Sequence, residues 1–387
     1  RRRDLLRHAS LLGAAAALPL PLVGCESDEE VSPEPEPRTV FLHGVASGDP
    51  LPDAVVLWTR VSSAAEPVTV SWEIASDPQM SESVGGGEVS TDESRDYTVK
   101  LDAQGLGGST TYYYRFSALG ETSPVGRTRT APTGAATRLR FGVASCANYA
   151  YGYFNAYRHL AARIDLDAVL FLGDYIYEYG DDEYGMARAL EPAHECVSLE
   201  DYRLRYAVNR TDPDLQAVHQ QLPFVAVWDD HETADNSWSG GAENHQPEDG
   251  PWAARKAAGL QAYLEWLPIR EQADGKLQRT LRYGDLVDLI VLDTRIWGRD
   301  EQAADGDDPI LADDTRTILG MDQEQWLYDE LTASTARWKL LAQQVMMGQL
   351  PQYLNTDAWD GYPFSRQRLF DLLRDQGIDD VVVLTGD

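Results

Sequence analysis

Lysine is scarce in this sequence, and so is positive charge. The 387 residues include 4 lysines and 29 arginines against 63 acidic residues, which gives a net charge of −30. This balance argues against a surface that binds nucleic acid. We interpret most of the acidic residues as surface solvation, with calcium binding or salt tolerance as the alternative. An anionic substrate would be repelled unless a bound cation inverted the local field.

Cysteine is also rare and occurs at positions 25, 146 and 196. Cys146 and Cys196 could pair as a disulfide in an oxidising compartment. Alternatively, Cys146 is a metal-binding thiolate and Cys196 stands alone. Spacing does not decide between these readings, but Cys146 directly follows a predicted strand, and that position favours the metal ligand.

The sequence has no apolar run long enough for a stable membrane-spanning helix. The most apolar stretch, residues 11–20, is short and contains a proline. It follows the pair Arg2-Arg3, which is typical of twin-arginine export signals. It is followed by Leu22-Val23-Gly24-Cys25, which resembles the lipobox of bacterial lipoproteins. We predict that residues 1–25 direct export through the twin-arginine translocase, and we favour lipidation at Cys25 over an ordinary cleaved signal.

The predicted location is therefore the periplasm or the cell surface, with membrane contact only through that lipid. Residues 26–38 contain acid and proline with almost nothing to bury, so we predict an extended tether. The sequence has no initiator methionine and stops at Asp387, directly after a predicted strand. We therefore expect it to be a piece of a longer protein.

Residues 39–131 have the pattern of an all-β domain. Short strand-like stretches recur, with turn residues at 47–50, 77–78 and 85–87. The stretches are Val55–Arg60, Val68–Ile74, Tyr97–Leu101 and Thr111–Ser117. This spacing predicts a β-sandwich of the immunoglobulin or fibronectin type. The segment contains no cluster of metal ligands, so we expect a packing or positioning role.

In residues 138–387, predicted strands alternate with helical stretches, which indicates an α/β domain. Apolar side chains recur at helical spacing in 153–160, 321–331 and 365–373. We predict two sheets that pack as a sandwich and are flanked by helices. The sequence has no internal repeat and no Gly-Xaa-Ser-Xaa-Gly motif of a serine hydrolase.

Polar motifs that suit metal ions follow four of the predicted strands. They are Ser-Cys after 139–144, Gly-Asp-Tyr-Ile-Tyr after 167–172, Asp-Asp-His-Glu after 224–228, and Gly-Asp shortly after 381–384. The carboxyl ends of neighbouring parallel strands meet in one crevice. We therefore expect these motifs to form one metal centre with a hydrolytic role.

Tyr177 is the most informative ligand candidate. It lies three residues after Asp174, whose carboxylate can bridge two cations. A phenol has a pKa near 10, so only a strongly Lewis-acidic ion such as Fe³⁺ readily holds it deprotonated at neutral pH. Taken alone, the motif could equally be a turn aspartate beside a core tyrosine.

The Asp-Asp-His-Glu motif supplies a second set of candidates. Asp230 is a candidate ligand for a second cation, and His231 is better placed as a proton donor to a leaving oxygen. Asn236 offers a neutral amide oxygen suited to Ca²⁺, and Asp235 precedes it. Taken alone, the motif could be a surface turn, but its position at a strand end argues against that.

Together these motifs resemble those of a known family. They are similar to the purple-acid-phosphatase type of metallophosphoesterase, and more closely to the PhoD-type alkaline phosphatases. The matching blocks are 44–52, 56–60, 144–146, 153–158, 172–178, 227–232 and 292–295. The resemblance covers roughly residues 39–387. It implies an N-terminal fibronectin- or immunoglobulin-like sandwich followed by an α/β/β/α catalytic sandwich that is incomplete at its C-terminus.

The resemblance also implies an iron site. Cys146, Asp174 and Tyr177 would bind Fe³⁺. In this family Gly-Asp is followed by Val-His, whose histidine binds the iron. The sequence ends at Asp387, so that ligand is not in it.

A calcium site is implied beside the iron. Asp174 would bridge to Ca²⁺, and Asn236 and Asp387 would complete that side. Asp230 and Asp235 would lie near an additional calcium ion.

The activity implied is hydrolysis of small phosphate monoesters and diesters for phosphate acquisition, by a monomer. The cations would neutralise the phosphate oxygens, supply a metal-bound hydroxide and stabilise the leaving alkoxide. His231 would protonate the leaving group. Arg295 could bind the phosphate as a bidentate fork, and the alternative is a buried salt bridge with Asp293.

Two rival functions fit the same residues. A phospholipase D-like or cyclic-nucleotide phosphodiesterase would use the same metals and select substrates through loops 179–212 and 237–250. A non-catalytic surface lipoprotein would bind Ca²⁺ through its acidic loops and would use its β-domain as the contact surface. Cys146 together with Tyr177 argues against the second, because calcium does not favour thiolate ligands. A thiol hydrolase is weaker still, because no histidine lies near Cys146 in the sequence.

Overall fold

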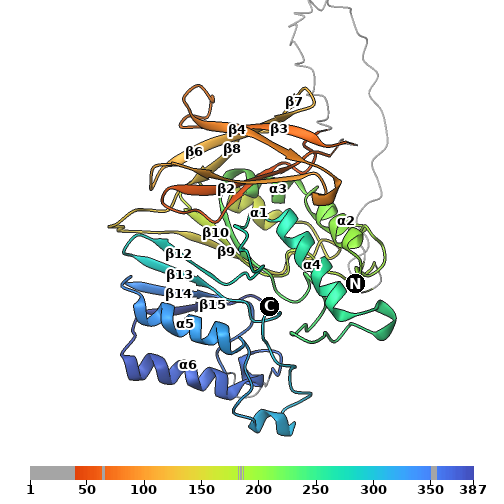
Figure 1. The fold of residues 1–387 in the computed structure, drawn as a ribbon, viewed down its shortest axis with the longest axis vertical. Coiled ribbons are helices and arrows are strands. Elements are labelled where there is room, and N and C mark those ends of the chain that lie inside the picture. The colour runs from red at the N-terminus through yellow and green to blue at the C-terminus, as the bar shows by residue number, and fades with distance from the viewer. Residues whose placement is uncertain (1–39, 63–65, 182, 184, 186, 350–354) are drawn as a thin grey trace, which may run out of the picture. The chain divides into compact units, whose positions relative to one another are not determined.

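Figure 1 shows the fold of this chain in a computed structural model. The structure describes residues 40–62, 66–181, 183, 185, 187–349 and 355–387. The predicted signal segment 1–25 with Cys25, and the tether 26–38, lie outside the described residues. In the part of the chain that is described, no helix is both long enough and apolar enough to cross a bilayer.

Strands dominate the first half of the chain, and helices alternate with strands in the second. The strands are β1 (Val45–Gly48), β2 (Ala54–Arg60), β3 (Val68–Ala75), β4 (Ser83–Thr91), β5 (Thr98–Gln104), β6 (Thr111–Ala118), β7 (Glu121–Thr122), β8 (Gly126–Arg129), β9 (Phe141–Ala144), β10 (Ala168–Leu172), β11 (Phe224–Val227), β12 (Arg279–Tyr283), β13 (Val287–Val291), β14 (Trp338–Ala342) and β15 (Val381–Leu384). The α-helices are α1 (Asn155–Ala161), α2 (Leu199–Asn209), α3 (Pro213–Gln221), α4 (Trp252–Trp266), α5 (Met321–Ala333) and α6 (Pro363–Gln376). The 3-10 helices are η1 (Glu93–Arg95), η2 (Pro247–Asp249), η3 (Pro309–Ala312) and η4 (Trp359–Gly361).

One six-stranded sheet is shared by the two halves of the chain. Its strand order is β5-β2-β1-β11-β10-β9. β1, from the N-terminal half, lies parallel to β11 with Gly48 opposite Phe224. The strands β9, β10 and β11 are parallel neighbours. The N-terminal strands therefore extend the same sheet that carries the candidate site.

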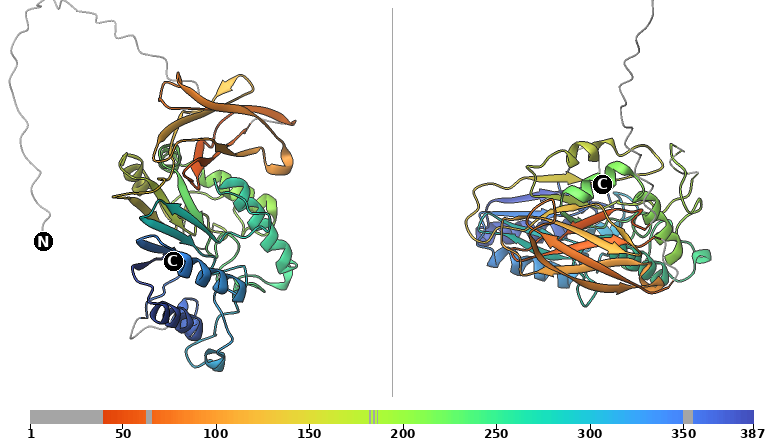
Figure 2. Two further views of the ribbon diagram at one scale, coloured as in Figure 1. Left: turned by 60° about the vertical axis from the view of Figure 1, so that its left-hand side comes forward. Right: turned by 90° about the horizontal axis from the view of Figure 1, so that it is seen from above.

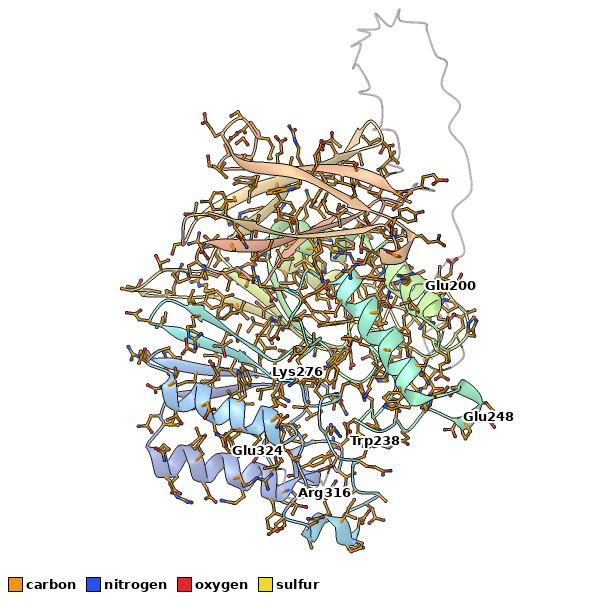
Figure 3. The ribbon with its side chains drawn as sticks, in the orientation of Figure 1. Glu200, Trp238, Glu248, Lys276, Arg316 and Glu324 are labelled. Carbon is orange, nitrogen blue, oxygen red and sulfur yellow. The ribbon has the colours of Figure 1, made fainter. Side chains whose placement is uncertain are left out.

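A four-stranded sheet, in the order β12-β13-β14-β15, forms the second layer of the C-terminal half. A continuous apolar core links residues of β10 and β11 with residues of β12 and β13. The helices α5 and α6 cover the outer face of the four-stranded sheet (Figures 1 and 2). Glu324 of α5, labelled in Figure 3, accepts hydrogen bonds from Arg368 and Ser365 of α6 at 2.9 and 3.1 Å. The layers confirm the predicted α/β fold class.

The N-terminal half completes a β-sandwich with a third sheet. That sheet has the order β4-β3-β6-β7, with β8 paired to β6. Its inward side chains pack on those of β2 and β5 in a separate apolar core. A sandwich of short antiparallel strands was expected for this segment from its spacing.

Two predicted turns of this segment are wrong. Residues 85–87 lie inside β4, where Gly86 pairs with Glu73 and Gly87 with Trp72. A Cβ on Gly86 would lie 2.8 Å from the carbonyl oxygen of Trp72, so glycine here allows close pairing instead of a turn. Likewise Ser47 and Gly48 end strand β1, and the turn begins after them.

Helix α2 is well anchored at its start. The Ser198 hydroxyl accepts the N–H of Asp201 at 3.2 Å, and the Asp201 carboxylate accepts the N–H of Ser198 at 2.8 Å. This reciprocal pair is a capping box, and it fixes where the helix begins.

Replacement of Gly48 by alanine tests the sheet that the two halves share. A Cβ at this position would lie 2.2 Å from the carbonyl oxygen of Pro268 and 2.7 Å from that of Phe224. Both are backbone atoms, so the β1–β11 junction would have to open. We expect the free energy of unfolding in a urea titration to fall by about 3 kcal/mol, the upper end of overpacking costs.

Gly152→Ala is the matched control, because no atom lies within 4 Å of a Cβ there. Equal losses in the two variants would contradict the proposed role of the junction.

Candidate metal centre

The candidate site lies where parallel strands of both sheets end. Cys146, Asp174 and Asp230 follow β9, β10 and β11 of the six-stranded sheet. Arg295 and Asp387 follow β13 and β15 of the four-stranded sheet. The structure thus brings the predicted motifs to one edge of the sandwich, as expected for α/β proteins.

Three side chains there could hold a metal ion together. Asp174, Asp230 and His231 each offer one ligand atom, and these atoms lie within 4.8 Å of one another. The Oδ1 atom of Asp174 and the Oδ2 atom of Asp229 are buried and accept no hydrogen bond. Buried carboxylate oxygens are normally paired, so these two atoms fit a cation as their missing partner.

Four of the six predicted metal ligands have left-handed backbone conformations. The φ angles are 58° for Cys146, 57° for Asp174, 53° for Asn236 and 55° for Asp387. This region is sparsely occupied by residues other than glycine, and such strain is concentrated at functional sites. The same conformation also occurs outside the site, for example at Asp49 and Leu119, so it does not by itself identify a ligand.

Gly173 allows β10 and β11 to end side by side. Its φ is 104°, and a Cβ would lie 2.4 Å from the Cβ of Asp229 and 2.6 Å from its backbone nitrogen. Any side chain at this position would separate Asp174 from the Asp-Asp-His-Glu motif.

Glu232 links the loop that follows β10 to the loop that follows β11. Its buried carboxylate accepts the N–H groups of Asp174 at 3.1 Å, Tyr175 at 2.7 Å and Asp229 at 2.7 Å. Burial raises the pKa of Glu232 more than these donors lower it, and the pKa is about 7.

His231 is oriented by Glu178. The His231 Nδ1 lies 2.7 Å from Glu178 Oε2, and Glu178 Oε1 also accepts the N–H of Asp235 and an amide N–H of Asn244, at 2.6 and 2.8 Å. A carboxylate can only accept, so Nδ1 carries a proton and Nε2 is the nitrogen left for other contacts. Burial lowers the pKa of His231, but the carboxylates of Glu178 and Asp230 outweigh it and raise the pKa well above its ordinary value.

Burial of carboxylates dominates the electrostatics of the site, and their mutual repulsion adds to it. Burial, and then the charges of Asp229 and Asp230, raise the pKa of Asp174 well above its ordinary value. Burial also raises the pKa of Asp229 despite the neighbouring Arg295. Asp230 is the exception, because Arg295 and His231 outweigh its burial and bring its pKa to about 2.

Arg295 is the buried cation that offsets part of this charge. Its Nε donates to Asp229, and its Nη1 donates to both carboxylate oxygens of Asp357 at 2.7 Å. Its Nη2 lies 3.4 Å from Asp230 and 3.7 Å from Asp387. The predicted alternative partner was Asp293, but among the described residues that carboxylate accepts the backbone N–H groups of Arg295 and Ile296 and not the guanidinium of Arg295. Since Nε and Nη1 are occupied, the arrangement leaves no bidentate fork for a phosphate.

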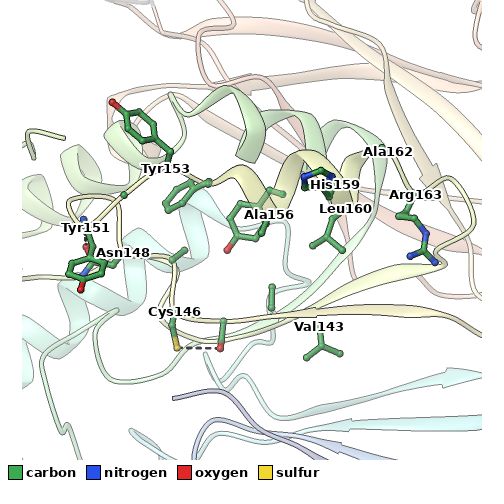
Figure 4. A pocket seen from close by; sticks show the side chains of 16 residues that line it. Val143, Cys146, Asn148, Tyr151, Tyr153, Ala156, His159, Leu160, Ala162 and Arg163 are labelled. Carbon is green, nitrogen blue, oxygen red and sulfur yellow. Dashed lines mark hydrogen bonds between the residues drawn. The ribbon is translucent and has the colours of Figure 1, made fainter. Parts of the chain in front are cut away.

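Tyr177 and Cys146 differ in how closely they approach the cluster. The Tyr177 hydroxyl donates to Asp174 Oδ2 at 3.2 Å, and its ring lies 4.3 Å from the ring of His231. Cys146 is exposed, and its Sγ lies 3.2 Å from the hydroxyl of Ser145. Cys146 lines a pocket of about 990 Å³ between the end of β9 and helix α1 (Figure 4). Cys196 is a buried free thiol, so the disulfide alternative is wrong for this structure.

Asn236 and Asp235 lie next to Asp230. The Asn236 N–H donates to Asp230 Oδ2 at 2.8 Å, and its side-chain amide donates to Glu243 at 2.7 Å. The Asp235 carboxylate accepts the hydroxyl of Tyr179 at 2.8 Å. Burial, and then the charge of Asp230, raise the pKa of Asp235 to about 6.

Sequence reasoning assigned no role to four residues that shape this site. They are Glu178, Asp229, Glu232 and Asp357. Three of them, Glu178, Asp229 and Glu232, lie inside the motifs that predicted the site, so their proximity to it could be expected from the sequence. Only the fold shows that their carboxylates are buried and hydrogen-bonded. Asp357 carries no signal in the sequence, because Arg295 reaches it from a separate segment.

The fold and the site define a class of protein. The chain has an N-terminal β-sandwich and an α/β/β/α body with a carboxylate- and histidine-containing candidate metal centre at the strand ends. The chain belongs to the PhoD-like phosphatase family, whose model matches residues 141–387. The model for the family's N-terminal domain matches residues 25–132.

Two relatives show the extent of the similarity. The chain is 40% identical over 380 residues to alkaline phosphatase D of Bacillus subtilis (strain 168), which covers 90% of this chain and 64% of that protein. A solved structure described as PhoD superposes with a TM-score of 0.85 at 39% identity, covering 90% of this chain and 72% of that one. The chain thus spans about two thirds of the length of the first relative.

The contribution of Glu232 to the stability of the metal-free protein should fall as pH rises from 4.5 to 7. Glu232 returns from a pKa of about 7 to its ordinary 4.5 on unfolding, so the folded state binds more protons in this window. The loss from Glu232 alone is about 3 kcal/mol. Asp230, with a pKa of about 2, is ionised in both states there and adds nothing. Urea titrations at pH 5 and 7 in the presence of a chelator measure the difference.

Glu232→Gln is the control, because it removes this titrating group, so the wild type should lose about 3 kcal/mol relative to the variant across this window. A difference between wild type and Glu232→Gln that stays constant from pH 4.5 to 7 would refute the raised pKa of Glu232.

Proposed function

We propose that this chain hydrolyses phosphate monoesters and diesters with the help of bound metal ions. The observation that carries the proposal is the group of buried carboxylates at the strand ends, Asp174, Asp229 and Asp230, in which Asp174 and Asp229 each have an unpartnered oxygen. Membership of the PhoD-like phosphatase family supports the same reaction class. Small phosphate esters are the proposed substrates, and phosphate acquisition is the proposed role.

The proposed ions are Fe³⁺ and Ca²⁺. Cys146, Asp174 and Tyr177 would hold the iron, because a thiolate and a phenolate suit a strongly Lewis-acidic ion. The contact between Tyr177 and Asp174 supports this set. When bound, such ions neutralise phosphate oxygens and activate water.

The calcium ligands proposed are further oxygen atoms near Asp174, which would bridge the two ions. They are Asn236 and Asp387, with Asp230 and Asp235 beside an additional calcium. All are Asp or Asn oxygens, the donor type that calcium prefers. The bonding of Asn236 to Asp230 supports their grouping.

His231 would donate the proton to the leaving oxygen. Its contact with Glu178 fixes the ring, and its raised pKa keeps a proton on it at neutral pH. Arg295 would contribute only through Nη2, which lies between Asp230 and Asp387 and makes no short hydrogen bond. We propose that this terminal NH2 group faces a phosphate oxygen, in place of the fork.

The proposed location is outside the cytoplasm. The arginine pair and the residues up to Cys25 support export by the twin-arginine translocase and a lipid anchor in the periplasm or at the cell surface. We propose that the enzyme acts as a monomer.

Elemental analysis of purified protein that extends past Asp387 through the Val-His segment implied by the resemblance tests the metal assignment. About one iron with calcium is expected per chain, together with a visible charge-transfer band from the thiolate and phenolate ligands. The band should be lost or strongly shifted in Cys146→Ala, whereas Cys196→Ala should retain it, because Cys196 is buried away from the proposed ligands. Calcium without iron would favour the calcium-binding alternative. Zinc in place of iron would keep the hydrolase but remove the roles of Cys146 and Tyr177.

His231→Asn tests protonation of the leaving group. We expect kcat to fall about 100-fold or more for alkyl phosphates, in line with loss of a general acid. Nitrophenyl phosphates have a leaving group that needs no proton, so their kcat should change much less. Exposed His159 gives the control His159→Asn. Equal losses for both substrate types, or a loss of bound metal, would indicate a ligand in place of a proton donor.

A further inference from the structure

Arg205 is a fully buried arginine on helix α2. Every hydrogen bond recorded for its guanidinium within the described part of the chain is to a main-chain carbonyl oxygen. No carboxylate in that part lies within ion-pair distance of it. Burial of a cation is costly unless it is fully hydrogen-bonded, so this residue calls for a specific reason.

The carbonyls that Arg205 binds belong to the two ends of one loop. We call residues 177–181 the first arm and residues 191–196 the second arm. The carbonyls are those of Tyr177, Tyr179, Glu191, Pro192 and His194. Nη1 donates to the first arm, at 2.7 Å for Tyr179, and Nη2 donates to the second, at 2.7 Å for Pro192 and 3.2 Å for His194.

Two backbone hydrogen bonds close the same loop. The Cys196 N–H donates to the carbonyl of Glu178 at 2.8 Å, and the Asp181 N–H donates to the carbonyl of Ala193 at 2.9 Å. The guanidinium of Arg205 therefore lies where backbone hydrogen bonds already join the two arms.

The first arm carries two tyrosines that contact the candidate metal centre. The Tyr177 hydroxyl donates to Asp174 at 3.2 Å, and the Tyr179 hydroxyl donates to Asp235 at 2.8 Å. Their rings lie 4.3 and 5.7 Å from the ring of His231. Because one Nη1 atom binds the carbonyls of both tyrosines, the placement of both phenols depends on the same guanidinium.

We propose that Arg205 is the positioning residue for Tyr177 and Tyr179, and through them for the contacts of Asp174, Asp235 and His231. The inference rests on the proposed function for its effect on turnover, but not for its effect on the loop. Arginine suits the task because five N–H groups in one plane reach both arms, whereas lysine offers three on a single atom.

Arg205→Lys is the test variant and Arg203→Lys the matched control. Arg203 lies on the same helix and forms an ion pair with Glu265 at 2.7 Å, but it does not touch the loop. The first measurement is hydrogen exchange of the Asp181 and Cys196 amides in metal-free protein. We expect exchange at least ~10-fold faster in Arg205→Lys and unchanged in the control.

The second measurement is steady-state turnover of the metal-loaded protein. Misplacement of reacting groups lowers kcat more than it weakens binding, so kcat should fall about 10- to 100-fold with KM within ~3-fold. If Arg205 acts through Tyr177, adding Arg205→Lys to Tyr177→Phe should cost much less than it costs alone.

Distinct outcomes would overturn this proposal. Unchanged exchange in Arg205→Lys would show that the loop does not depend on the guanidinium. Faster exchange with unchanged kcat would leave Arg205 a purely structural residue. If the Arg205→Lys variant does not fold, hydrogen exchange in the wild-type protein provides the test. Rapid exchange of the Asp181 and Cys196 amides in the wild type would also contradict the proposal that Arg205 holds the two arms together. Absence of metal and turnover in the wild type would refute the proposed function, while the exchange result would still decide the role of Arg205 in the loop.

Discussion

The burial of several carboxylates side by side at the strand ends is the constraint on which the rest of this structure depends. Asp174, Asp229 and Asp230 are held together by Gly173 and by the three N–H contacts of Glu232. One guanidinium, that of Arg295, offsets only part of this charge. Such an arrangement is unfavourable unless cations complete it, because buried charge without a partner is among the most costly features a fold can contain.

Two levels of structure supply the rigidity that this arrangement requires. The sheet beneath the site continues through β1 into the N-terminal sandwich, so the ends of β9, β10 and β11 rest on six strands. Above the site, a loop and helix α2 hold the aromatic side chains around His231. The N-terminal half thus contributes to the candidate site through the backbone of β1.

Much of this could be predicted from local sequence. Strand ends followed by Gly-Asp or Asp-Asp-His-Glu located the site, because parallel strands deliver such motifs to one edge. The glycines at 85–87 were misread as a turn, since sequence does not distinguish glycine that turns from glycine that permits close strand pairing. The partners of Arg295 could not be predicted, because they come from segments distant in the sequence. The contacts of Arg205 could not be predicted either, because they are made to main-chain carbonyl oxygens, which every residue has.

The left-handed conformations of Cys146, Asp174, Asn236 and Asp387 have a further consequence. Each non-glycine residue held there costs on the order of 1 kcal/mol. Glycine at any of the four would relax the backbone and remove a side chain that we propose as a metal ligand. A glycine variant of Asn236 should therefore fold at least as stably as the wild type while weakening the proposed calcium site, which separates what the fold requires at these positions from what the proposed chemistry requires.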